Sequence, residues 1–468
     1  MARVLLIFPP YSLEEEYSGL AEVGNLQLPL GIGYLGAVLE KAGFEVKIFD
    51  APPLGWGIKR LVSETKKFTP DFVGISSATV DFHKTVRLAE ALKKSQNVTI
   101  IIGGPHMTAL PEEAMKLSCF DVGVIGEGEE TIVKLIQALI KKSNLRKVAG
   151  IAFREGKKII KTTPRSYIKN LDSLPFPARH LMPPLSAYHP TPATYKKFPV
   201  ATMMTSRGCP YHCTFCFRGV FGNQLRFRSP ENVIAEMEML IFEFGAAEIR
   251  IFDDTFNADP ERVKAICRLM IKRNLKFPWT CLARVNRVDP QMLSLMKKAG
   301  CWQISYGIES GNDEVLAKIK KGITKKMAKK TVKMTYQAGI QPLGFFILGL
   351  PGETEETMKE TIEFAKSLPL NAANFSIATP YPGTELWASA KKRGFLDNIA
   401  YEKLVVNLPD KPYYLPEGLK AETVQEYERK AYREFYRNPK FILRQLVEID
   451  SLPEFWRKLK AFFTIQAI

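Results

Sequence analysis

Short apolar runs alternate with helical segments over the first 150 residues of the chain. Residues 4–8 form a continuous apolar run that predicts a strand buried on both faces, and residues 30–42 have helical periodicity up to Gly43. Further apolar runs follow at 45–50, 72–76, 98–103 and 122–125. This alternation predicts an open, doubly wound α/β domain over residues 1–146, with ligands bound at the carboxyl ends of its parallel strands.

The same alternation resumes at residue 200, after an irregular connector. Residues 147–199 contain a predicted hairpin that turns at Glu155 and Gly156, followed by six prolines between 175 and 192 that prevent regular structure. From 200 to 385, apolar runs are each followed by a loop with glycine or polar residues. This predicts a partial β/α barrel, which builds its site at the carboxyl ends of its strands.

Residues 386–468 have a helical composition rich in aromatic residues and lysine, with helices expected at 426–436, 441–448 and 452–463. Their aromatic residues recur near helical spacing, which is typical of a face that packs on the neighbouring barrel. A basic amphipathic surface that makes peripheral contact with a membrane is the alternative, and it would suit a lipid substrate.

Composition excludes several classes of protein. No apolar run reaches the roughly 18 residues that a transmembrane helix needs, and the first apolar run is too short for a signal peptide. Seven cysteines, an odd number, indicate the reducing cytoplasm rather than a disulfide framework. Much of the net charge of +17 lies in lysine-rich helical segments such as residues 318–333 and in the tail after residue 420, without an interleaved aromatic surface on which bases could stack. This indicates a solvated face and no nucleic-acid partner.

Three cysteines carry the most specific chemistry. Cys209, Cys213 and Cys216 have the spacing C-x3-C-x2-C and offer three thiolates to an iron–sulfur cluster that needs four ligands. One iron is then open to bind a substrate or cofactor, while Phe215 shields the cluster from water. A zinc site completed by His212 is the alternative, but no second cysteine pair is present to support it.

The triad resembles the signature of the radical S-adenosylmethionine (radical SAM) enzymes. The resemblance implies a 4Fe–4S cluster whose open iron binds SAM and cleaves it reductively to a 5′-deoxyadenosyl radical, which removes hydrogen from an unactivated carbon. It also implies SAM contacts at strand ends, from Asp253 and Asp254 to the amino group, from Arg284 to the carboxylate, and from Glu309 and Ser310 to the ribose and methionine. Each of these residues could instead cap a helix or form a turn. Arg226 and Arg228 suit an anionic substrate or a structural role equally.

Small, glycine-rich loops follow the strands of the first domain. Taken together and in order, they resemble the cobalamin-binding domain that precedes the radical SAM core in one large subfamily. In that subfamily the serine loop lies under the corrin and the two later loops hold the nucleotide tail. The implied cobalamin contacts are Ser76 and Thr79, then Gly103, Gly104 and His106, then Gly126, Glu127, Gly128 and Glu129.

The histidine that ligates cobalt in the methionine synthase type is not expected here. Asp81 and His83 match part of the motif Asp-x-His-x-x-Gly, but Val86 replaces its glycine and the segment follows the third strand rather than the first. We interpret His83 as a chance match and His106 as a residue near the nucleotide tail. The resemblance therefore implies base-off cobalamin without a protein histidine ligand.

These features predict a cobalamin-dependent radical SAM enzyme that methylates an unactivated carbon of a small-molecule or lipid substrate, with a flavodoxin or ferredoxin as electron donor. The segments 380–385 and 435–440 are also similar to the anaerobic oxidative cyclases of chlorophyll synthesis and to hopanoid-modifying enzymes. Oxidation or rearrangement of a porphyrin or isoprenoid without methyl transfer therefore remains an alternative. A cobalamin or cluster sensor is the non-enzymatic alternative, although no output module is recognised.

Overall fold

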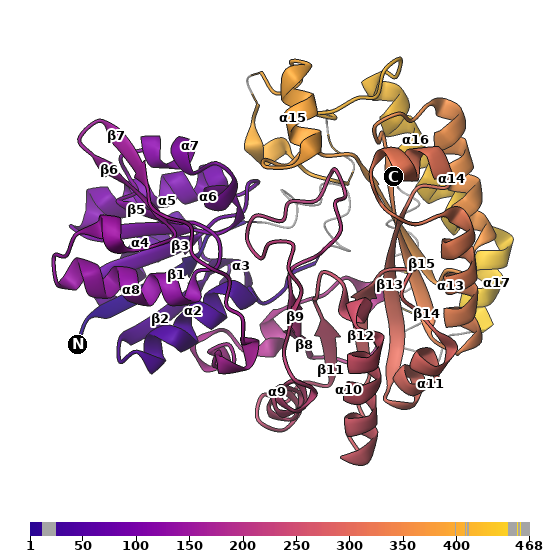
Figure 1. Cartoon of the computed structure of the whole chain (residues 1–468), viewed down its shortest axis with the longest axis horizontal. Coiled ribbons are helices and arrows are strands. Elements are labelled where there is room, and N and C mark those ends of the chain that lie inside the picture. Colours follow the sequence, from indigo (N-terminus) through magenta and orange to yellow (C-terminus); the bar gives the residue numbers. More distant parts are fainter. Residues whose placement is uncertain are drawn as a thin grey trace.

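The computed structural model describes residues 1–11, 25–397, 399–407, 409, 411–447, 456 and 459. Figure 1 shows two sheets side by side, the first in indigo and purple and the second in magenta to orange. The helix predicted at 452–463 lies almost wholly outside the described residues, as does the last residue of the segment 441–448. The predicted fold class, a doubly wound domain followed by a parallel β/α core and carboxyl-terminal helices, is confirmed.

The first sheet has the strand order β2-β1-β3-β4-β5-β6-β7. Its first five strands are parallel, and the predicted hairpin forms β6 and β7, which extend the same sheet antiparallel beyond residue 146. The order reverses between β1 and β3, so the loops after these strands flank the switch point at which such sheets bind ligands. The strands are β1 (Arg3–Phe8), β2 (Glu45–Asp50), β3 (Phe72–Ser76), β4 (Thr99–Gly103), β5 (Val122–Val124), β6 (Ile151–Glu155) and β7 (Lys158–Lys161); the helices are α2 (Leu30–Lys41), α3 (Ala51–Leu54), α4 (Ile58–Phe68), α5 (Phe82–Ser95), α6 (Pro105–Ala109), α7 (Pro111–Lys116) and α8 (Glu129–Ile140).

The second sheet is parallel, with the order β15-β14-β13-β12-β11-β8. Its strands are β8 (Val200–Met203), β11 (Glu248–Ile251), β12 (Trp279–Ala283), β13 (Cys301–Glu309), β14 (Gln341–Leu348) and β15 (Ala372–Ile377). Between β8 and β11 lies a two-stranded ribbon of β9 (Ser206–Arg207) and β10 (Arg226–Phe227), which brackets the three cysteines. The helices are α9 (Pro230–Phe242), α10 (Pro260–Lys272), α11 (Pro290–Lys298), α12 (Asp313–Lys318), α13 (Lys325–Gln337) and α14 (Glu355–Ser367).

The carboxyl-terminal region consists of α15 (Glu385–Lys392), α16 (Ala421–Tyr436) and α17 (Pro439–Val447). The aromatic face of α16 packs on the second sheet, as predicted: Tyr432 accepts a hydrogen bond from the Phe375 amide on β15, and Tyr436 donates one to the Ala373 carbonyl. Phe435 stacks edge-on against Phe375. Among the described residues, no helix is long and apolar enough to cross a membrane.

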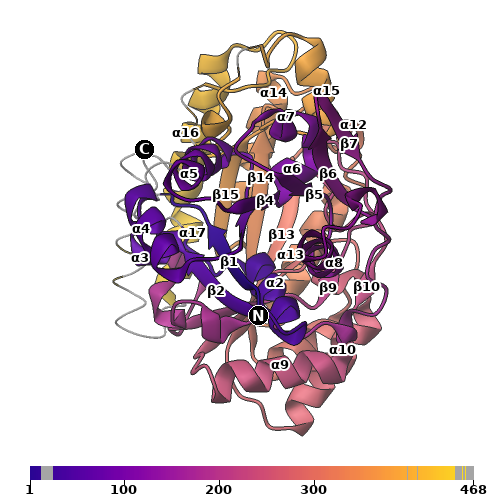
Figure 2. The same ribbon diagram turned by 90° about the vertical axis from the view of Figure 1, so that its left-hand side faces the viewer.

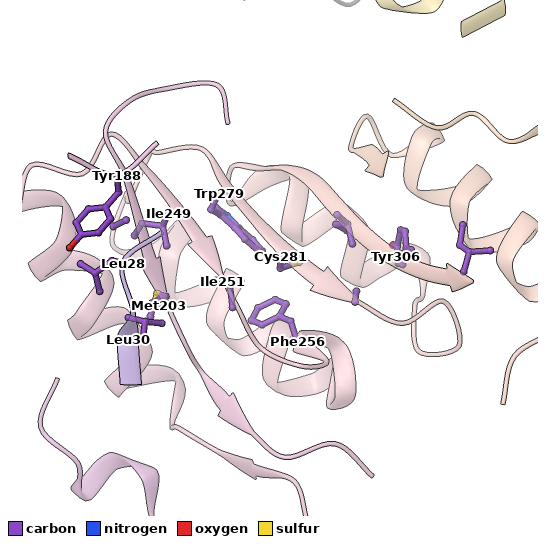
Figure 3. Close-up of a cluster of buried hydrophobic side chains, with 14 of the residues drawn as sticks. Leu28, Leu30, Tyr188, Met203, Ile249, Ile251, Phe256, Trp279, Cys281 and Tyr306 are labelled. Atoms are coloured by element: carbon purple, nitrogen blue, oxygen red, sulfur yellow. The ribbon is translucent and has the colours of Figure 1, made fainter. Parts of the chain in front are cut away.

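One hydrophobic core joins the two sheets. Figure 3 shows Leu28 and Leu30, which precede and begin α2, beside Met203 of β8 and Ile249 of β11. Tyr188 of the connector closes this core from the side and is 2% exposed. The two domains therefore bury apolar surface against each other, which favours one fixed arrangement.

Tyr188 donates a 2.7 Å hydrogen bond to the buried carboxyl of Asp50, whose pKa is raised by burial to about 7. The folded chain therefore holds this proton up to about pH 7, whereas the unfolded chain loses it near pH 4, so stability falls as pH rises through that window. A pKa of about 7 in place of 3.8 corresponds to roughly 4 kcal/mol. We expect Asp50→Asn to remove most of this pH dependence in urea unfolding between pH 5 and pH 8; an unchanged slope would contradict the assignment.

Candidate functional site

A cavity of about 880 Å³ lies between the carboxyl ends of the two sheets. Figure 2 shows the first sheet in front of the second, so loops from both can reach the space between them. Most of the candidate residues line this cavity, namely Ser76, Gly103, Gly104, Gly126, Glu127, Gly128, Glu129, Cys209, Cys213, Phe215, Cys216, Asp254, Arg284 and Glu309. Thr79, His106, Asp253 and Ser310 do not.

The three cysteines lie on one loop between β9 and β10. Gly208 begins this loop with a φ of +87°, and a Cβ there would collide with the Gln224 carbonyl, so only glycine suits the position. The loop is tied to the second sheet's other loops, because the Thr214 amide donates to the Ile319 carbonyl at 3.1 Å and the Thr214 carbonyl accepts from the Leu386 amide at 2.9 Å. All three cysteines line the cavity. Within the described residues, no three or more His, Cys, Asp or Glu side chains are close enough together to hold a single metal ion, whereas the cysteine ligands of an iron–sulfur cluster bind separate irons.

Positive charge surrounds the most buried of these thiols. A hydrogen bond from Cys216, together with Lys321 and Arg284, lowers the pKa of Cys213 to about 6, whereas the pKa of Cys216 is raised. Arg284 approaches the Cys213 sulfur at 3.7 Å and lies over the Tyr211 ring at 3.5 Å. Because thiolates are the metal-binding form, this environment favours ligation by Cys213 at neutral pH.

Glu309 is aimed into the cavity by a local irregularity of β13. The register between β13 and β14 shifts at Gly307–Glu309, and Glu309 has a φ of +68°, which is strained for a residue with a side chain. Its carboxylate accepts a hydrogen bond from Lys321, and both side chains are at least nine-tenths buried. A Cβ at Gly307 would collide with this pair. Sequence reasoning missed Lys321, which lies in a lysine-rich segment.

The two aspartates after β11 have different surroundings. Asp253 is buried and accepts hydrogen bonds from the Thr205 amide and the Ser206 hydroxyl at 2.6 Å, so it fixes the start of the cysteine loop. Asp254 faces the cavity, and its pKa is raised by desolvation and by Asp253. Ser310 shares a hydrogen bond with Thr361 at 3.2 Å and accepts from the Asn312 amide, away from the cavity.

Arg226 and Arg228, which the sequence left open, both make internal ion pairs. Arg226 binds Glu127 of the first domain at 2.8 Å. Arg228 pairs with the fully buried Glu236 and donates to the Met204 carbonyl at 2.8 Å. Their guanidinium groups are therefore used to hold the chain together.

The loops of the first sheet leave room for a large ligand. Gly104 has a φ of +96°, and a Cβ there would lie 2.8 Å from the Ser77 carbonyl oxygen, so glycine is required where the loops after β3 and β4 meet. Ser76 lines the cavity, whereas Thr79 is buried and does not line it. Glycine backbone and small hydroxyls suit the polar edge of a flat macrocycle such as a corrin.

No histidine is among the residues that line the cavity within the described part of the chain. His83 is half-buried, with its Nδ1 3.2 Å from the Val80 carbonyl oxygen. His106 is fully buried and stacked on Phe82 at 3.7 Å between ring centroids, and burial lowers its pKa to about 4. Neither His83 nor His106 therefore lines this cavity.

The turn at 380–385 holds the cysteine loop through a glycine. Gly383 has a φ of +81°, and a Cβ there would lie 2.5 Å from the ring of Phe217, next to Cys216. We expect Gly383→Ala to displace the loop, destabilise the chain by about 1–3 kcal/mol and lower the iron content after reconstitution. Gly418→Ala is the matched control, because Gly418 has a φ of +79° and open space around it. Equal iron content in the two variants would show that backbone strain alone accounts for the effect of Gly383→Ala, and would contradict a role of Gly383 in placing the cysteine loop.

Comparison with family models gives two matches. The radical SAM superfamily model matches residues 203–365, which include the cysteine loop and most of the second sheet. The B12 binding domain model matches residues 18–136, which include four of the five parallel strands of the first sheet.

Several curated proteins are similar over nearly the whole chain. An uncharacterized methyltransferase of Pyrococcus horikoshii is 35% identical over 95% of both chains. The cytidylyl-2-hydroxyethylphosphonate methyltransferase of Streptomyces wedmorensis is 30% identical over 87% of this chain and 86% of its own. The anaerobic magnesium-protoporphyrin IX monomethyl ester cyclase of Cereibacter sphaeroides is 28% identical over 93% of this chain and 70% of its own.

Among solved structures, the radical S-adenosylmethionine methyltransferase TsrM of Kitasatospora setae, with cobalamin and a 4Fe–4S cluster bound, has the same fold. The TM-score is 0.71 over 92% of this chain and 85% of that chain, at 18% sequence identity.

Proposed function

Because this chain belongs to the family of cobalamin-binding radical SAM enzymes, we propose that it methylates an unactivated carbon of a small-molecule or lipid substrate. The observation that carries the proposal is the shared cavity: the three thiols open into the same space as the loops of the first sheet. A cluster-bound SAM and a cobalamin held by those loops would then face each other. Two of the three curated relatives described above are named as methyltransferases, which supports methyl transfer over other radical chemistry.

The overall reaction balances with two molecules of SAM and two electrons. One SAM gives up its methyl group through cobalamin, which supplies the methyl carrier, and leaves as S-adenosylhomocysteine. The other accepts an electron, breaks its S–C5′ bond to methionine and a 5′-deoxyadenosyl radical, and takes one hydrogen from the substrate C–H bond. The products are therefore the C-methylated substrate, S-adenosylhomocysteine, methionine and 5′-deoxyadenosine, and the electrons come from a flavodoxin or ferredoxin in a reducing cytoplasm.

Each side chain around the cysteines has a proposed role in holding SAM. Arg284 is proposed to pair with the carboxylate, because a guanidinium matches its geometry. Glu309, oriented by Lys321, accepts from the ribose hydroxyls or the amino group, and Asp254 faces the amino group. No histidine from this chain ligates cobalt in the proposal, since none lines the cavity within the described residues.

The test is anaerobic reconstitution with iron, sulfide and cobalamin, followed by reductant and methyl-labelled SAM. Methylation predicts 5′-deoxyadenosine, S-adenosylhomocysteine and label on the extracted cobalamin. The second candidate, oxidative cyclisation or rearrangement, is favoured by the similarity to the Cereibacter sphaeroides cyclase. It predicts 5′-deoxyadenosine without S-adenosylhomocysteine and without label on cobalamin.

A further inference from the structure

Four buried charged side chains connect the first domain to the cysteine loop. Glu127 and Glu129 come from the loop after β5 and the start of α8, and Arg207 and Arg226 come from β9 and β10. Arg207 donates to Glu127 at 3.0 Å and to Glu129 at 2.5 Å, while Arg226 donates to both oxygens of Glu127 at 2.8 Å. All four are 7% exposed or less. We call them the interdomain clamp.

Aromatic rings from three segments enclose the clamp. The Arg207 guanidinium lies 5.0 Å from the ring centroid of Tyr34 on α2 and 4.9 Å from that of Phe221 in the cysteine loop. Arg226 lies 4.9 Å from the ring of Tyr167 in the connector. Contacts with two rings from different segments restrict the movement of the Arg207 guanidinium, which favours one geometry for the two carboxylates that it binds.

The Glu127 carboxylate of the clamp is already satisfied by the protein. Glu127 accepts from both arginines and from the Ile168 amide at 2.9 Å, and two negative charges balance two positive charges. The cofactor contact implied for this loop by sequence resemblance would require these oxygens to exchange one of those donors. Buried ion pairs add little net stability compared with apolar residues, but breaking one leaves an uncompensated charge, so they select a single arrangement.

We propose that the interdomain clamp sets the position of the cobalamin loops relative to the cysteine loop, and so couples methyl transfer to SAM cleavage. This inference rests on the proposed function. Arg207 is two residues before Cys209, and Glu127 lies between the two glycines that line the cavity after β5. In the proposed function, SAM cleavage uses residues of the second domain, whereas methyl transfer from SAM to cobalamin requires the two domains to be correctly placed relative to each other. The clamp residues are therefore positioning residues.

The variants Glu129→Gln and Arg207→Lys test the clamp. Glu129→Gln keeps the shape of the side chain and removes its charge, whereas Arg207→Lys keeps the charge and removes the planar guanidinium. Lysine cannot span two carboxylates as the arginine fork does. Glu130→Gln is the matched control, since Glu130 is the next residue, is exposed, and pairs with Arg165 at 3.4 Å on the surface. For each, iron content, cobalamin content, 5′-deoxyadenosine and S-adenosylhomocysteine are measured, together with hydrogen exchange of the cofactor-free chain.

We expect both clamp variants to keep their iron and cobalamin, with 5′-deoxyadenosine within about twofold of wild type and S-adenosylhomocysteine reduced by about tenfold or more. Amide exchange should rise in α2 and β9, and the control should match wild type. Loss of cobalamin would overturn the inference in favour of direct cofactor binding, and a parallel fall of both products would show a general structural role. If wild type forms no S-adenosylhomocysteine, the proposed function fails, and unchanged exchange in the variants would separately reject the clamp.

Discussion

Replacing Cys213 with alanine is expected to reduce 5′-deoxyadenosine formation to background, a fall of more than about a thousandfold, as when one member of an interdependent catalytic group is removed. Cys213 is 6% exposed, its pKa is lowered to about 6, and Arg284 lies 3.7 Å from its sulfur. Of the three thiols, Cys213 is therefore the one whose surroundings most favour metal binding. With only Cys209 and Cys216 left, a cluster would lack a third protein ligand.

The measurement is iron and sulfide content, the electron paramagnetic resonance spectrum of the reduced cluster, and 5′-deoxyadenosine after addition of SAM. Cys119→Ala is the matched control, because Cys119 is a buried thiol of the first domain whose pKa is raised by burial to about 11. It should lose about 1 kcal/mol of stability and none of the activity. A Cys213→Ala protein that still holds a spectroscopically intact cluster and cleaves SAM would rule out the ligand assignment.

Features encoded by neighbouring residues were predictable from the sequence. The strands of both sheets, the hairpin at Glu155 and Gly156 and the helix that ends before Gly43 depend on apolar periodicity and turn residues within a few positions of each other. The cysteine spacing is equally local. The packing of α16 on β15 followed from the helical spacing of its aromatic residues.

Features that depend on distant partners were not predictable. Nothing near Lys321 distinguishes it from its lysine neighbours, and its burial against Glu309 arises only when β13 bulges at its end. Glu127 resembled a ligand-binding residue of a glycine-rich loop, yet its ion-pair partners are arginines roughly 80 to 100 positions later. Ser310 and His106 lie beside candidate residues in sequence, but their side chains point into packed surroundings rather than the cavity. The pattern of a single sequence indicates where helices and strands form, whereas side-chain contacts between distant segments depend on how those helices and strands are packed together.

The pair of Lys321 and Glu309 gives the second large expected effect. Lys321→Met leaves the buried Glu309 carboxylate without its cation, which should destabilise the chain by about 3–5 kcal/mol. It should also lower 5′-deoxyadenosine formation, because Glu309 would no longer be held in the strained conformation that aims it into the cavity. Lys320→Met is the matched control: Lys320 is the next residue, and its ion pair with Glu385 is exposed on both sides, so a cost of at most about 1 kcal/mol is expected.

A double variant separates stability from catalysis. Adding Glu309→Gln to Lys321→Met removes the unpaired charge, so urea unfolding should recover most of the lost stability. Formation of 5′-deoxyadenosine should stay about tenfold or more below that of wild type. The reason is that a glutamine amide is a weaker acceptor than a carboxylate for the ribose or amino group of SAM. Recovery of both stability and SAM cleavage in the double variant would mean that the pair only supports the fold. Recovery of stability alone would indicate that Glu309 contacts SAM and that Lys321 orients the Glu309 side chain.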